Sequence, residues 1–193
     1  MQQTVLDKPM KSLCVYCGSR PGHDPEHLRA AQTLGREAAR RGCRIVYGGG
    51  KMGLMGAAAG AARDAGGKVF GVIPEFLVAV EGILEGVDHK VVQTMHERKM
   101  LMFEESDVIV ALPGGIGTLE ELVETLSWAR LSLHDKPIVA VNINGFWNPL
   151  RSLFEHMVEA GFAPVELLRE ITFAEGVDEV FAIAERSRLR AVV

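Results

Sequence analysis

The chain lacks any long hydrophobic run, any cluster of basic residues and any dense set of cysteines. No apolar stretch approaches the roughly 20 residues that a membrane-spanning helix needs, and residues 1–12 contain no apolar core of signal-peptide length. The cysteines number three, an odd and sparse set that is typical of reduced thiols rather than of disulfides. These absences predict a cytoplasmic protein that does not associate with membranes.

The charge distribution argues against nucleic acid as a partner. The formal net charge is -4, and the lysines and arginines form no basic stripe. The length of 193 residues, with 48% hydrophobic and 24% charged, fits one globular domain over residues 1–193, of which 1–11 are expected to form a flexible tail. Glycine is abundant, at 21 residues, but it gathers between periodic segments, which indicates loops.

The segment Cys14-Val15-Tyr16-Cys17 matches the C-x-x-C pattern of zinc and redox sites. It lies in an apparent strand, where residues three positions apart point to opposite faces of the sheet. The sequence offers no second cysteine pair and no histidine partner that would complete a zinc site. His96 also has no histidine or cysteine at ligand spacing. We therefore expect neither a metal nor a bound cofactor.

Apolar runs alternate with helical stretches along the chain. Strands are expected at residues 12–17, 44–47, 68–73, 107–112 and 138–141, with shorter ones near 89–92 and 171. Helices are expected at 25–41, 54–65, 94–105, 119–133, 149–160 and 177–188, and the stretch after residue 74 is less regular. This alternation predicts a single Rossmann-like α/β domain, a parallel sheet with helices on both faces.

Ligands of such sheets bind beyond the carboxyl ends of the strands. The loop Pro113-Gly114-Gly115-Ile116-Gly117-Thr118 begins there and runs from a continuously apolar strand into a helix. Glycines let a ligand approach the backbone closely, and a helix start offers unpaired N–H groups with about +0.5 charge from the helix dipole. The loop therefore predicts an anion site. The alternative is a tight turn before a capped helix.

Another glycine loop, Gly48-Gly49-Gly50-Lys51-Met52-Gly53, contains a G-x-G-x-x-G match. Glu75 follows the next strand at about the distance expected of the ribose-binding acid in a dinucleotide fold, so NAD is a competing ligand. The match follows the second strand rather than the first, which weakens that interpretation. Close packing of helix on strand is the structural alternative. After the first strand, Ser19 offers a hydroxyl to a phosphate, or serves in an ordinary turn.

Charged residues follow two of these segments. Thr118 and Glu121 have the capping-box spacing, which favours a structural role for Glu121 unless a sugar lies beside the loop. Glu120 and Glu121 differ by about 100° around the helix, so at most one faces a site, and spacing does not say which. Thr94 and Glu97 form a second capping box. Arg98, on a partly apolar helix face, needs an anionic partner, which is either a substrate or a nearby carboxylate.

Taken together, these motifs resemble the LONELY GUY proteins, which are cytokinin riboside 5′-monophosphate phosphoribohydrolases once mistaken for lysine decarboxylases. Residues 113–121 match that family's P-G-G-x-G-T-x-x-E signature, and residues 95–99 match its M-H-x-R-K motif. Further landmarks are Cys17-Gly18-Ser19, the glycines of 48–50, and Gly71-Val72-Ile73-Pro74. The resemblance covers about residues 13–161.

The resemblance implies hydrolysis of the N-glycosidic bond of a cytokinin riboside monophosphate or AMP, which releases the free base and ribose 5-phosphate. It implies that Arg98 and Glu121 are the catalytic pair, that the family's choice falls on Glu121 rather than Glu120, and that the enzyme is a homodimer with sites near the subunit interface. The residues implied to bind substrate are Ser19, Gly50, Glu81, Lys99, Gly114, Gly115, Ile116, Gly117, Thr118 and Ser127. Two of them, Ile116 and Ser127, depart from the plant members, which bears on base preference.

Cleavage of such a bond builds positive charge on the ribose and negative charge on the leaving base. We expect the phosphate to anchor the sugar without reacting. The main alternative is a non-catalytic nucleotide or phosphorylated-cofactor carrier, since related Rossmann-like proteins with such loops serve that way by resemblance. An NAD-dependent oxidoreductase ranks below it. A lysine decarboxylase ranks last, because nothing here resembles a pyridoxal phosphate lysine site.

Overall fold

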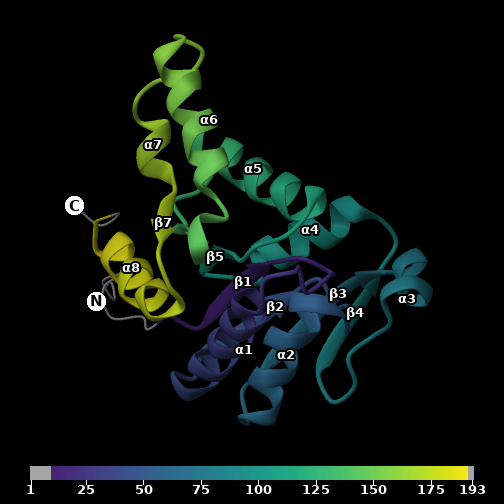
Figure 1. Ribbon diagram of the computed structural model, residues 1–193. Coiled ribbons are helices and arrows are strands. Elements are labelled where there is room, and N and C mark those ends of the chain that lie inside the picture. The colour runs from purple at the N-terminus through teal and green to yellow at the C-terminus, as the bar shows by residue number, and fades with distance from the viewer. Residues whose placement is uncertain (1–9, 191–193) are drawn as a thin grey trace, which may run out of the picture.

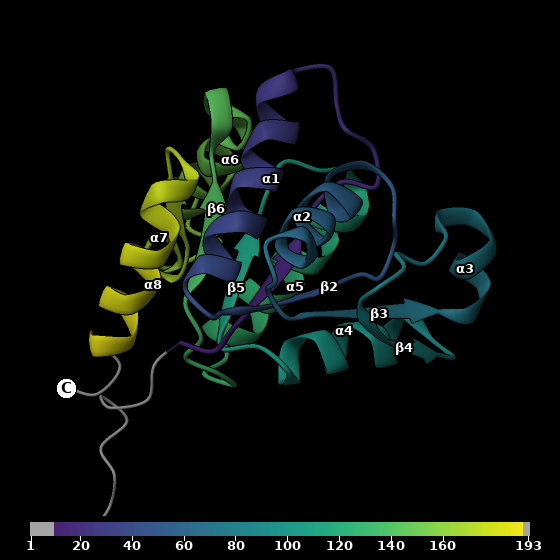
Figure 2. The same cartoon turned by 90° about the horizontal axis from the view of Figure 1, so that it is seen from below.

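The computed structural model describes residues 10–190 and consists of one parallel sheet with helices on both faces (Figures 1 and 2). The seven strands lie in the order β4-β3-β2-β1-β5-β6-β7. In chain order their bounds are Ser12–Tyr16 (β1), Arg44–Tyr47 (β2), Val69–Pro74 (β3), Asp88–Val92 (β4), Val108–Ala111 (β5), Ile138–Val141 (β6) and Thr172–Ala174 (β7). Each neighbouring pair is parallel, as the alternation of elements predicts.

Two hydrophobic clusters separate the helices by face. One cluster joins α1, α2 and α8 to the sheet, and the other joins α4, α5, α6 and α7 to the opposite face. The helices span Pro25–Arg40 (α1), Gly53–Asp64 (α2), Glu75–Glu81 (α3), Met95–Glu104 (α4), Ile116–Arg130 (α5), Asn148–Glu159 (α6), Leu167–Glu170 (α7) and Val177–Arg190 (α8). A short 3₁₀ turn, Ile143–Gly145, follows β6.

The sheet reverses its direction of growth between β1 and β5. From β1 the chain adds β2, β3 and β4 on one side, and then returns to place β5 on the other side of β1. Such a switch point opens a crevice beyond the carboxyl ends of the two strands. The loops that leave β1 and β5 are joined there, because the Gly18 N–H donates a hydrogen bond to the Pro113 carbonyl over 3.1 Å.

The cysteines lie where the strand pattern predicts. Cys14 belongs to one hydrophobic cluster and Cys17 to the other, so the two thiols face opposite sides of the sheet. Burial raises the pKa of the Cys14 thiol to about 12 and raises that of Cys17 further. A buried neutral thiol is a poor nucleophile and a poor metal ligand, so this C-x-x-C segment is part of the core.

The structure differs from the predicted elements at a few points. Helix α3 occupies the stretch after Pro74, which shows no helical pattern because none of its residues is buried. Helix α5 begins at Ile116, three residues earlier than predicted, so half of the predicted loop forms its first turn. The short helix α7 is also additional.

The predicted tail, residues 1–11, lies outside the described residues except for its last two. Met10 packs against the hydrophobic cluster that contains α1, and the Lys11 N–H donates to the Asp107 carboxylate over 2.8 Å. Of the helices in residues 10–190, none has the length and apolar character to cross a membrane.

Candidate active site

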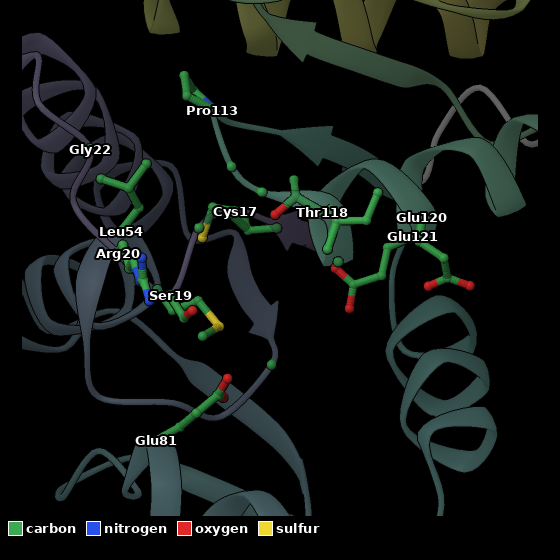
Figure 3. A pocket seen from close by; sticks show the side chains of 18 of the residues that line it. Cys17, Ser19, Arg20, Gly22, Leu54, Glu81, Pro113, Thr118, Glu120 and Glu121 are labelled. Carbon is green, nitrogen blue, oxygen red and sulfur yellow. The ribbon is translucent and has the colours of Figure 1, made fainter.

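A cavity of about 500 Å³ lies at the switch point, within the size range of small-molecule sites. The loop after β1 contributes Ser19 and Arg20, and the loop after β2 contributes Gly48. The loop after β5 and the first turns of α5 form another wall, and Arg98 reaches the cavity from α4. Figure 3 shows how these segments surround the space. The cavity thus collects segments that are far apart in sequence, as the rule for parallel sheets predicts.

The start of α5 is built as an open helix end. Gly115 is the N-cap and provides no side-chain cap, so the first N–H groups of the helix lack an intrahelical partner. A Cβ added at Gly115 or Gly117 would meet no atom within 4 Å, whereas one at Gly114 would lie 2.2 Å from the Thr118 hydroxyl. At Gly115 and Gly117, therefore, neither a neighbouring side chain nor a positive φ requires the residue to be glycine. The space beside this helix end is therefore available to a ligand, and the dipole favours an anion there.

Arg98 is held in the cavity wall although it carries a full charge. Its side chain is 6% exposed, its Nη2 donates to the Gly48 carbonyl over 3.1 Å, and its Nη1 approaches the Met95 sulfur at 3.8 Å. Its Nε is buried and has no hydrogen-bond partner within the described part of the chain. A Cβ at Gly48 would lie 1.8 Å from Nη2, so glycine is needed there for the guanidinium to fit.

Glu121 enters the cavity from α5 and is only 8% exposed. Loss of solvation by burial raises the pKa of its carboxyl group to about 7. The positive charges of Arg98 and Lys99 oppose this shift, whereas the negative charges of Glu120 and Glu81 add to it. A carboxyl group with a pKa near neutrality can hold or release a proton under physiological conditions, which suits acid–base catalysis.

The structure corrects one capping prediction and supports half of the other. Thr118 lies inside the first turn of α5 and is not its N-cap, so Thr118 and Glu121 form no capping box. In α4 the Thr94 hydroxyl accepts from the Glu97 N–H over 3.1 Å, as predicted. The Glu97 carboxylate accepts from Gln93 rather than from Thr94, over 2.8 Å, and Glu97 is structural.

The predicted catalytic and substrate-binding residues divide into two sets. The cavity lining includes Ser19, Glu81, Arg98, Glu121 and the run from Gly114 to Thr118. Gly50, Lys99 and Ser127 do not line it. Lys99 Nζ instead bonds Glu120 over 2.6 Å and Glu124 over 2.9 Å, which ties α4 to α5. Ser127 is exposed on α5.

Several lining residues were not predicted as site residues. Met55, Met95 and Met102 give one side of the cavity an apolar wall, and His27 and Phe146 form another part, with their rings edge to face at 5.5 Å. Phe146 follows β6, so the carboxyl-end rule identifies its loop but not its side chain. Met95 begins the M-H-x-R-K motif, which could have identified it, whereas no motif quoted above distinguishes Met55 and Met102 from core residues.

The glycine loop at residues 48–53 does not build a dinucleotide site. Glu75 is exposed at the start of α3, accepts from Gln93 over 3.4 Å and is not part of the cavity wall. Gly53 has a φ of +59°, and its Cβ would lie 2.3 Å from the Ser19 carbonyl carbon. The loop therefore serves close backbone packing. Within residues 10–190, no group of three His, Cys, Asp or Glu side chains is arranged to hold a metal ion.

Comparison with known proteins identifies relatives over most of the chain. Residues 55–184 match a family model described as "Possible lysine decarboxylase". A protein of Rhodococcoides fascians named cytokinin riboside 5′-monophosphate phosphoribohydrolase is 47% identical over 154 residues, which are 79% of this chain and 78% of the relative. The protein LOG3 of Arabidopsis thaliana, which has the same enzyme name, is 44% identical over 161 residues, covering 83% of this chain and 75% of the relative.

Solved structures with the same fold include carriers. The molybdenum cofactor (Moco) carrier protein of Chlamydomonas reinhardtii superimposes with a TM-score of 0.71 at 23% identity, covering 94% of this chain and 99% of that one. The molybdenum cofactor binding protein of Rippkaea orientalis gives a TM-score of 0.70 at 21% identity, covering 93% and 98%. At these identities the likeness shows the fold alone.

Proposed function

Since the chain belongs to the LONELY GUY family, whose relatives are named cytokinin riboside 5′-monophosphate phosphoribohydrolases, we propose that it hydrolyses the N-glycosidic bond of a purine riboside 5′-monophosphate. The substrate is AMP or a cytokinin riboside monophosphate, and the products are the free base and ribose 5-phosphate. The observation that carries this proposal is that a buried arginine and a buried glutamate line one cavity beside an open helix end. Cleavage needs an anion anchor and groups that stabilise opposite charges, and this cavity provides both.

The phosphate binds at the start of α5. Backbone N–H groups near Gly115 and Gly117 donate to its oxygens, and the hydroxyls of Ser19 and Thr118 lie on the same cavity wall. Ile116, which is 82% exposed at this wall, borders the bound nucleotide. The phosphate does not react, but its binding energy fixes the sugar against the catalytic groups.

Glu121 and Arg98 act on the bond that breaks. Glu121, whose pKa is about 7, donates a proton to the leaving purine, and the resulting carboxylate stabilises the cationic ribose. Arg98 remains charged and stabilises the electrons that move onto the base, because a guanidinium is a poor proton donor. Such preorganised charges contribute most where water is excluded, which agrees with the burial of both side chains.

The test is incubation of the purified protein with AMP, isopentenyladenosine monophosphate and adenosine, followed by chromatography for free base and ribose 5-phosphate. We expect release from at least one of the monophosphates and far slower cleavage of adenosine, which lacks the anchoring phosphate. The ratio of the two monophosphate rates measures base preference. Comparable efficiency on adenosine and AMP would overturn the role of the helix end.

A non-catalytic nucleotide carrier is the second candidate, because the open helix end at Gly115 would hold a phosphate whether or not the bond is cleaved. In that case the cavity binds AMP, as measured by calorimetry, but no base is released. The presence of both Arg98 and Glu121 in the cavity favours the enzyme, since a carrier has no use for a carboxyl group with a neutral pKa.

We also propose a cytoplasmic homodimer in which α5 forms part of the interface. Val123 and Leu131 are 41% and 65% exposed, and Ser127 lies between them at four-residue spacing on the same side of the helix. A second copy packed on this side would cover the apolar residues and bring Ser127 close to the partner's site. Light scattering should give twice the monomer mass, and Leu131→Glu should reduce it. A monomeric wild-type protein at micromolar concentration would overturn this arrangement.

A further inference from the structure

A second carboxylate, Glu81, faces the cavity from a different wall. It belongs to the last turn of α3 and lines the same space as Glu121 and Arg98. Figure 3 shows the Glu81 and Glu121 side chains pointing into this space from separate elements. The negative charge of Glu81 raises the pKa of Glu121, so the two groups are close enough to interact through the cavity.

The carboxylate of Glu81 differs from those of Glu120 and Glu124 in its lack of a partner among the described residues. Its Oε2 is buried and has no hydrogen-bond partner within residues 10–190. Glu120 and Glu124, in contrast, both bond Lys99. A buried carboxylate oxygen without a partner is costly, because it loses its hydration and gains nothing in return. Glu81 therefore presents a strong acceptor to whatever occupies the cavity.

The backbone around Glu81 is fixed so that the side chain keeps this position. The Lys51 N–H donates to the Glu81 carbonyl over 3.4 Å, and an isolated bridge pairs Gly50 with Ile83. Gly82 ends α3 with a φ of +65°, and its N–H donates to Val78 over 3.0 Å. A Cβ at Gly50 would lie 3.0 Å from the Glu81 Oε2, so the absence of a side chain there gives the carboxylate its room.

We propose that Glu81 is the general base that activates the attacking water in the hydrolysis proposed above. In glycoside hydrolysis with inversion, one carboxyl group acts as the acid and the other as the base, on different sides of the sugar. Among the described residues, three carboxyl groups line the cavity, and Lys99 pairs with that of Glu120. Glu121 on α5 is the acid, which leaves Glu81 as the base. This inference rests on the proposed function and adds a catalytic residue to it.

The proposed hydrolysis is a displacement of the purine by water at C1′ of the ribose. The water oxygen forms a bond to C1′ while the bond from C1′ to the purine nitrogen breaks, and the bonding electrons leave with the purine. Glu81 takes one proton from the water. Glu121 gives its proton to the purine, and the proton on Glu81 returns to solvent and Glu121 is reprotonated before the next turnover.

The experiment uses Glu81→Ala in the full-length protein, assayed with the monophosphate that the wild type cleaves. We expect kcat to fall by about 10²- to 10⁴-fold, the usual contribution of a placed base, with little change in KM. Sodium azide, a nucleophile that needs no base, should restore part of kcat in this variant and yield ribosyl azide 5-phosphate, detected by mass spectrometry. Wild-type kcat should not rise with azide.

Glu85→Ala is the matched control, because Glu85 is exposed in the same segment and does not line the cavity. It should keep wild-type kcat and form no azide adduct. A raised KM with wild-type kcat in Glu81→Ala would make Glu81 a sugar-binding group and overturn the proposal. A low kcat without azide adduct, in a variant whose thermal unfolding matches wild type, would overturn it as well. If the wild type cleaves neither monophosphate, the proposed function itself fails, which is a separate result.

Discussion

The two glycine-rich loops resemble each other in sequence but use their glycines for opposite purposes. In residues 48–53 the missing side chains leave space that the protein itself fills, with Arg98 against Gly48 and the Ser19 backbone against Gly53. In residues 113–118, Gly115 and Gly117 border space that no protein atom occupies within 4 Å of an added Cβ. The first loop therefore positions parts of the protein, whereas the second leaves room for a ligand. A glycine motif alone does not distinguish these uses.

Gly48→Ala tests the first loop at its contact with the site. The new methyl group would occupy the position of Arg98 Nη2, so the guanidinium must move away from its carbonyl partner. We expect kcat with the cleaved monophosphate to fall by about 10²- to 10³-fold, the effect of losing one preorganised charge contact. Gly60→Ala is the control, since a Cβ at Gly60 meets nothing. Full activity in Gly48→Ala would show that Arg98 needs no such placement.

Gly53→Ala tests the structural role of the same loop. Its φ of +59° disfavours any side chain, and the methyl group would collide with backbone atoms of the Ser19 loop. Denaturant titration should show a loss of about 2–4 kcal/mol in the free energy of unfolding. Gly66→Ala, with a φ of +76° but open space around its Cβ, should lose only the conformational part. Equal losses in the two variants would argue against the packing explanation.

Glu121→Gln tests the helix that follows the second loop. Glu121 is buried on this helix, and the variant measures what the burial of its charge costs. The folded-state pKa of about 7 exceeds the ordinary value of 4.5, so ionised Glu121 disfavours folding. The cost is absent below about pH 4.5, grows as the pH rises to 7 and is constant above. We therefore expect Glu121→Gln to be more stable than wild type at pH 8, by up to about 3 kcal/mol, and equally stable near pH 4.5. Thermal unfolding across this range measures the difference, and a gap that does not depend on pH would contradict it.

The same pKa predicts how activity depends on pH. Glu121 must be protonated to donate to the purine, so kcat/KM should fall as the pH rises above about 7. A rate that increases through this range would assign Glu121 to stabilisation of the ribose cation as a carboxylate instead.

Gly117→Ala tests the second loop and carries the smallest expected effect. Because a Cβ there meets no protein atom, and alanine favours helix, we expect unfolding stability to be unchanged or higher by up to about 1 kcal/mol. The KM for the monophosphate should rise by about 10- to 100-fold, as expected for a disturbed hydrogen bond to a charged group. A gain in stability together with a loss of binding would separate the two loops. An unchanged KM would show that the phosphate does not bind beside Gly117.

Much of the fold could be predicted from sequence because periodicity reports burial. The strands β1 and β5 are continuously buried and the surrounding helices each have an apolar side, so these elements and their parallel sheet could be predicted, but the strand order and the switch point were not. Helix α3 escaped prediction for the same reason, since its apolar residues Phe76 and Val80 face outward. A pattern that signals burial does not reveal an element that buries nothing.

The site was predicted in part. Residue order placed the Pro113 loop at the sheet edge, but the choice between Glu120 and Glu121 depends on where α5 begins. Both side chains line the cavity, but Glu121 is buried there whereas half-exposed Glu120 pairs with Lys99, which favours Glu121 as the catalytic residue. The sequence also does not say whether the apolar residues Leu119, Leu122, Val123 and Leu126 of this helix belong to the core or to an interface. Leu122 and Leu126 are core residues, and Val123 is at the surface.

Glu81 Oε2 and Arg98 Nε, which lack hydrogen-bond partners within the described residues, also bear on the order in which the products leave. Ribose 5-phosphate retains the anchoring phosphate and the sugar hydroxyls, so it can keep most of the proposed hydrogen bonds of the substrate to the cavity. The free base keeps few of them. We expect the base to depart first and the sugar phosphate last. Ribose 5-phosphate should then inhibit competitively against the nucleotide and raise the melting temperature, with adenine doing neither. The turnover rate in the cell would thus decrease as the concentration of ribose 5-phosphate rises.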